Sequence, residues 1–179
     1  MRVPVGLVAL GLLSGAALAQ DQQPYAASSA RAIKSLSDQQ IADLKEGRGM
    51  GLALAAELNG YPGPRHAIEL AKPLGLTDEQ LVRLQALFLS MKSETVAIGE
   101  RLIAQEAALN DQFARKTISP DSLATAVRDI GTTQAELRTA HLRYHLLALD
   151  ILSPQQARRY GELRGYLKPG AHNHASHPG

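Results

Sequence analysis

Histidine is the side chain in this sequence whose placement most clearly indicates chemistry, and the chain has six of them. Two of the six, His141 and His145, are four residues apart in a segment with helical patterning, and His66 stands alone in the first half of the chain. The other three form an H-x-H-x-x-H tract near the C-terminus: His172, His174 and His177. Neutral imidazole is the commonest metal ligand among side chains. The histidines therefore favour metal binding over other chemistry.

The spacing of His141 and His145 places two imidazoles on one face of a helix, with Cβ atoms roughly 6 Å apart. Both rings can then reach one ion at a metal–nitrogen distance of about 2 Å. The same spacing also arises by chance, as two surface or half-buried histidines. His141, however, falls on the apolar stripe of its helix, where an apolar residue is expected.

Further ligands for this pair are expected from two other segments. Antiparallel pairing of the two long helices predicted below places position 141 opposite about position 94, which is Glu94. His66 stands in a short segment that must cover these helices. We therefore expect a core site of His66, Glu94, His141 and His145, although Glu94 is equally explained as a solvated helix carboxylate.

The types of side chain available as ligands limit which metal ion can bind. The chain has no cysteine, so a thiolate site is excluded, and zinc, copper(II), nickel and cobalt remain open. The three histidines of the tail have a composition typical of segments that collect metal ions, so we expect them to bind metal; a low-complexity polar end is the alternative.

Two long helices are predicted to position the core site. Apolar residues recur at alternating steps of three and four over about residues 78–116 and 121–151. The short connection between them, with Ser119 as cap and Pro120 in the first turn, makes the helices antiparallel neighbours. Shorter helices are expected at about 52–58, 65–72 (ended by Pro73 and Gly75) and 154–166. The predicted fold is all-α: a long antiparallel helical hairpin with short flanking helices.

Three helix starts share one capping pattern, a hydroxyl residue followed three positions later by glutamine. The hydroxyl residues are Ser37, Thr77 and Ser153, and a leucine precedes each. Two of these starts form a pair of related motifs: Leu76, Thr77 and Gln80, and Leu152, Ser153 and Gln156.

The N-terminus has the pattern of an export signal. Arg2 is followed by an apolar run and then by Ala17-Leu18-Ala19 in cleavable form, which predicts a signal peptide over residues 1–19 and a periplasmic protein. An uncleaved N-terminal membrane anchor is the alternative. After the signal we expect a flexible arm at 20–32, one helical domain at 33–167 and a disordered histidine-containing tail at 168–179.

The paired motifs resemble the LTxxQ motifs of the Spy/CpxP family of periplasmic proteins. The stretch Ala56-Glu-Leu-Asn-Gly-Tyr-Pro-Gly-Pro64 and the histidine pair resemble the heavy-metal-resistance branch of that family, the CnrX/ZraP-like metal sensors. The resemblance covers about residues 36–166. It implies a four-helix hooked hairpin that forms a cradle-shaped homodimer.

The resemblance also implies one of two activities. The first is sensing or buffering of divalent transition-metal ions, in which His66, Glu94 and His141 take ligand roles and His145 stands where the sensors have methionine. The second is ATP-independent chaperoning of unfolded periplasmic clients or an envelope-stress adaptor role, with a sensor protein as partner.

Other classes find little support in the sequence. A formal charge of +2 gives no strong field for nucleic acid. No cysteine nucleophile, G-x-S-x-G elbow or P-loop is present, and the histidine pair lacks the glutamate of H-E-x-x-H. We therefore expect a binding protein and no enzyme.

Overall fold

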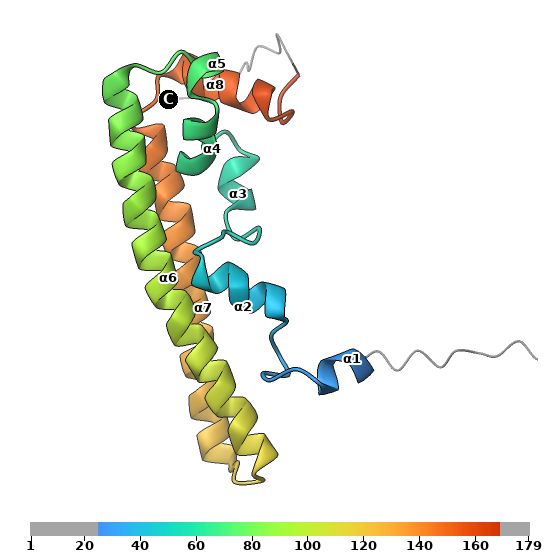
Figure 1. Ribbon diagram of the computed structural model, residues 1–179. Coiled ribbons are helices and arrows are strands. Elements are labelled where there is room, and N and C mark those ends of the chain that lie inside the picture. Colours follow the sequence, from blue (N-terminus) through green and yellow to red (C-terminus); the bar gives the residue numbers. More distant parts are fainter. Residues whose placement is uncertain (1–24, 169–179) are drawn as a thin grey trace, which may run out of the picture.

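The structure is a computed structural model that describes residues 25–168, and within this range the chain forms eight helices and no strand. Two long helices, α6 (Asp78–Ala114) and α7 (Pro120–Leu149), lie side by side and run in opposite directions (Figure 1). Ion pairs join Arg101 to Glu136 and Arg143 to Glu94, so residue numbers rise along one helix as they fall along the other. The predicted all-α class and the packing of two long helices are confirmed.

The short helices line one side of this pair (Figure 1). They are α1 (Ala26–Ser29), α2 (Asp38–Lys45), α3 (Leu54–Glu57), α4 (Pro64–Glu69), α5 (Ala71–Leu74) and α8 (Pro154–Leu163). The helix expected at 65–72 is split into α4 and α5. Pro73 does not end α5, because it stands in the first turn, where a backbone N–H has no intrahelical partner. Gly75 ends it instead, in the left-handed conformation with φ 63°.

All three predicted capping boxes form. The side chains of Ser37, Thr77 and Ser153 each accept a hydrogen bond from the backbone N–H three residues on, and the glutamine there accepts one from the cap residue. Ser119 caps α7 in the same way, with Ser122 in place of glutamine.

The glutamines of the two paired motifs also bind each other. Gln80 Nε2 donates to Gln156 Oε1 at 2.8 Å, and Gln156 Nε2 donates to Gln80 Oε1 at 3.0 Å. Gln80 Nε2 also donates to the carbonyl of Ile151 at 2.9 Å. The motifs therefore join the start of α6 to the start of α8.

The apolar core has two separate parts. One contains Leu102 of α6 and Leu137 of α7 together with Leu44 of α2. The other contains Leu84 of α6 and Ala148 of α7, along with residues of α4, α5 and α8. Each long helix therefore makes apolar contacts on both sides of a middle stretch. The two histidines of α7 that are predicted as ligands fall in that stretch.

Some of the predicted segments fall outside the residues that the structure describes. The signal segment 1–19 and the tail histidines lie outside the described residues, and α1 occupies part of the segment expected as a flexible arm. No helix of the described range has the length and apolar character needed to span a bilayer.

The apolar stripe of α7 predicts that Leu123 and Val127 contact the other long helix. In the structure both are exposed near the loop between the long helices, where none of the short helices lies (Figure 1).

Replacing Gln80 with alanine tests the junction between α6 and α8. Gln80→Ala removes half of a capping box and leaves the Ile151 carbonyl and the Gln156 side chain without this partner. We expect the free energy of unfolding to fall by about 1–3 kcal/mol, measured by urea denaturation. The matched control is Gln85→Ala, at an exposed position of the same helix, which should change it by less than about 0.5 kcal/mol. Equal effects of the two substitutions would contradict the role of Gln80.

Candidate metal centre

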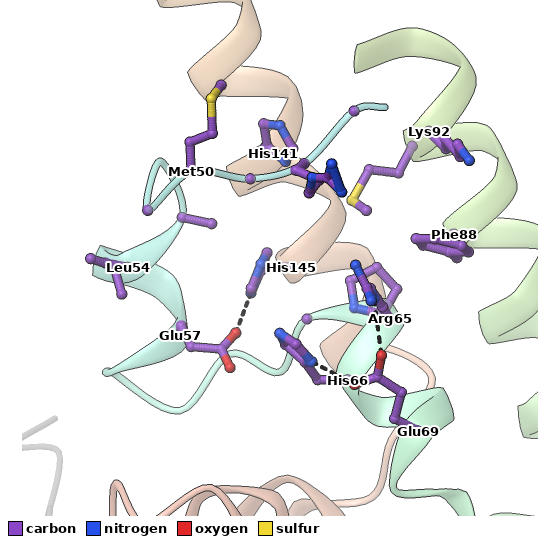
Figure 2. A pocket seen from close by; sticks show the side chains of 18 of the residues that line it. Met50, Leu54, Glu57, Arg65, His66, Glu69, Phe88, Lys92, His141 and His145 are labelled. Atoms are coloured by element: carbon purple, nitrogen blue, oxygen red, sulfur yellow. Dashed lines mark hydrogen bonds and ion pairs between the residues drawn. The ribbon is translucent and has the colours of Figure 1, made fainter. Parts of the chain in front are cut away.

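A cavity of about 750 Å³ lies in the middle stretch, between the two parts of the apolar core. It is bounded by the long helices, by α3 and α4, and by the loop at residues 46–51. Its lining includes His66, His141, His145, Glu57, Met50 and Met91, and we call it the central pocket (Figure 2). Every histidine and every methionine of the described range lines this pocket. The residue types that bind transition metals are therefore concentrated in one place.

His145 is held in a defined orientation. Its Nδ1 lies 2.8 Å from the carbonyl oxygen of Tyr61. Because a carbonyl can only accept, Nδ1 carries a hydrogen, and in the neutral ring Nε2 holds the lone pair. Such a backbone contact is a common way to fix the tautomer of a metal-binding histidine.

Gly63 leaves the room that this orientation needs. A Cβ at position 63 would lie 3.0 Å from Cε1 and 3.2 Å from Nε2 of His145. Any other residue would therefore press on the ring of His145.

His66 is anchored in a similar way but is more accessible. Its Nδ1 lies 2.8 Å from Oε2 of Glu69, and its side chain is 37% exposed (Figure 2). The same hydrogen bond is the main cause that lowers the pKa of Glu69. With Nδ1 engaged by the carboxylate, Nε2 is the nitrogen left for other ligands.

His141 is the most deeply buried of the three. Its exposed fraction is 3%, and its Nε2 is buried without a hydrogen-bond partner among residues 25–168. Burial, followed by repulsion from His145, lowers its pKa, so the ring is neutral at pH 7. An unsatisfied buried polar group costs about 1–3 kcal/mol, and native proteins contain few of them. This nitrogen could bind a metal ion, and the described chain gives it no hydrogen-bond partner.

Glu57 is a buried carboxylate that the sequence analysis did not single out. Its Oε2 lies 3.6 Å from Nδ1 of His145. Its Oε1 accepts hydrogen bonds from the hydroxyls of Tyr160 and Tyr166, the latter at 3.1 Å, and lies 3.6 Å from Nε of Arg164. Burial and this carboxylate raise the pKa of Tyr160, which stays protonated as a donor. The negative charge of Glu57 is therefore compensated largely from the C-terminal end of the described chain.

Glu94, the predicted carboxylate ligand, lies elsewhere. It accepts hydrogen bonds from Arg143 and from the hydroxyl of Tyr144, the latter at 2.9 Å, and it is not among the residues that line the central pocket. Position 94 faces position 143, two residues beyond the expected partner. Of the four predicted core ligands, the structure thus brings His66, His141 and His145 to one pocket and places Glu94 outside it.

The side chains do not already form a closed metal cage. Within residues 25–168, no three histidine or acidic side chains come close enough together to hold one ion. Comparison of the chain with family models, with curated proteins and with solved structures finds no match.

The burial of His141 predicts a pH dependence of stability. The unfolded ring has a pKa near 6.5, and the folded ring a lower one, so below about pH 6.5 the unfolded state takes up a proton that the folded state resists. The free energy of unfolding should therefore fall as the pH drops from about 7 to 5.

The neutral variant His141→Gln isolates this contribution. Its free energy of unfolding should fall less steeply over the same pH range when both proteins are denatured with urea in the presence of a chelator. Parallel curves for the two proteins would contradict the assignment of a neutral, desolvated ring.

Proposed function

We propose that this protein binds a transition-metal ion in the central pocket, with His141 and His145 as the primary ligands. The observation that carries the proposal is the buried, unpartnered Nε2 of His141, one helical turn from a histidine whose Nδ1 is engaged by a backbone carbonyl. An ion bound there supplies the partner that Nε2 lacks. Since the pKa of His141 is lowered, its ring is in the neutral form that binds metal ions near neutral pH.

The remaining ligands come from the short helices. His66 of α4 has its Nε2 available, and Glu57 of α3 lies next to His145. Because no three of these groups yet converge, adding a third histidine or acidic ligand requires α3 or α4 to move towards α7. The ion then favours the conformation in which the short helices are drawn onto the long pair, and a partner can respond to that conformation.

This activity agrees with the family to which the sequence analysis points. In that setting the protein is an exported, periplasmic metal-binding stress or resistance protein with the hooked-hairpin fold, acts as a homodimer, and senses or buffers the ion without catalysis. The supporting features are the paired glutamine motifs, the histidine pair and the signal-like N-terminus.

A second candidate function is chaperoning, and exposed apolar side chains support it. Val82 and Leu89 of α6 and Leu146 of α7 are each more than half exposed. Such side chains offer adaptable contacts to unfolded clients. An aggregation assay with a model client in the presence of a chelator tests it: undiminished protection favours chaperoning as the main activity, and protection that requires metal links the two.

Metal titration of the full chain tests the first proposal. Zn(II), Ni(II), Co(II) and Cu(II) are titrated into protein in which the tail histidines are replaced (His172→Ala, His174→Ala and His177→Ala), so that only pocket ligands remain. We expect one tight site per chain for at least one ion. Adding His141→Gln and His145→Gln should weaken it by about a hundredfold or more, because both primary ligands are lost.

The controls separate a lost ligand from a lost fold. Both proteins are melted without metal to verify folding, and His66→Gln should weaken binding less than either α7 substitution. Tight binding that survives the loss of both His141 and His145 would contradict the proposed site.

A further inference from the structure

We infer that the ion preferred by the central pocket is monovalent copper, Cu(I), with the thioether of Met91 as a ligand beside His141 and His145. This inference rests on the proposed metal-binding function and adds the class of ion. It derives from the methionines, which that function did not use.

The distribution of methionine is the first observation. The chain has three methionines, of which Met1 lies outside the described residues, and the other two both line the central pocket. Met91 is 7% exposed and belongs to α6, on the opposite long helix from His141. Soft thioether sulfur selects Cu(I) over the harder divalent ions.

Packing alone does not account for Met91. Methionine is often used in protein interiors to fill irregular gaps. Here the side chain borders a cavity of about 750 Å³ that it leaves unfilled, and the same cavity contains an imidazole nitrogen without a partner.

Charge favours a monovalent ion. The ligand set of two neutral imidazoles and one thioether carries no charge, so a bound divalent ion would leave two uncompensated charges in a buried site. Glu57 could compensate only one of them, and its charge already interacts with Arg164 through Oε1. Cu(I) leaves a single charge and is stable at a low coordination number. A low coordination number suits a pocket in which no three histidine or acidic groups of the described range converge.

Met50 provides a matched control. It stands at the rim of the same pocket, is 41% exposed, and its side chain points away from His145 (Figure 2). Met50→Leu and Met91→Leu make the same chemical change, one at the rim and one at the buried position.

The experiment is an anaerobic competition titration of the full chain, with the tail histidines replaced as above, against a chromophoric Cu(I) chelator. Zn(II) is titrated in parallel. We expect Met91→Leu to weaken Cu(I) binding by about tenfold or more and to leave Zn(II) binding unchanged, whereas Met50→Leu leaves both unchanged. Copper X-ray absorption should show a sulfur neighbour that Met91→Leu removes. Because leucine and methionine are close in volume, thermal melting should confirm that both variants fold.

The outcomes separate this inference from the function on which it rests. Cu(I) affinity that is unchanged in Met91→Leu, or reduced equally in Met50→Leu, overturns the role of Met91. A site that binds Zn(II) through His141 and His145 but not Cu(I) overturns the inference and leaves the proposed function intact. Absence of binding by every tested ion overturns both.

Discussion

Two imidazoles are buried in the contact between the two long helices. His141 and His145 lie between the two apolar clusters, at positions where aliphatic side chains would give more stability. His145 is satisfied by the Tyr61 carbonyl, whereas Nε2 of His141 has no partner in the described chain. A fold that keeps such a group retains a destabilising feature, which the proposed ion would remove.

The rest of the molecule holds the two histidines in place. One apolar cluster and the helix α2 fix the long helices on one side, and α2 can approach because Gly99 presents no side chain: a Cβ there would lie 2.7 Å from the carbonyl oxygen of Leu44. A second cluster and the reciprocal Gln80–Gln156 hydrogen bonds fix them on the other side. Between the two clusters lies α3, which is four residues long and is followed by a turn. It is therefore the part best able to adjust to a ligand.

The sequence predicted the features of the fold that local residue patterns control. The long helices, their short connection and the capping boxes depend on residues within a few positions of one another, and all appear in the structure. Glu57 could not be predicted in this way, because a four-residue helix has no periodicity and the contacts of Glu57 with Tyr160 and Tyr166 span about a hundred positions. The partner of Glu94 depends on the register between the two long helices. Counting residues outward from the loop predicts position 141 as its partner, and the structure has position 143.

Side-chain ¹⁵N NMR of the histidines, recorded with and without metal, tests whether His141 and His145 hold an ion. We expect Nε2 of His141 and of His145 to change their chemical shifts together on saturation with Cu(I) or Zn(II), while Nδ1 of His145 stays protonated against the Tyr61 carbonyl. Signals of His141 and His145 that stay unchanged while only the tail histidines respond would contradict it.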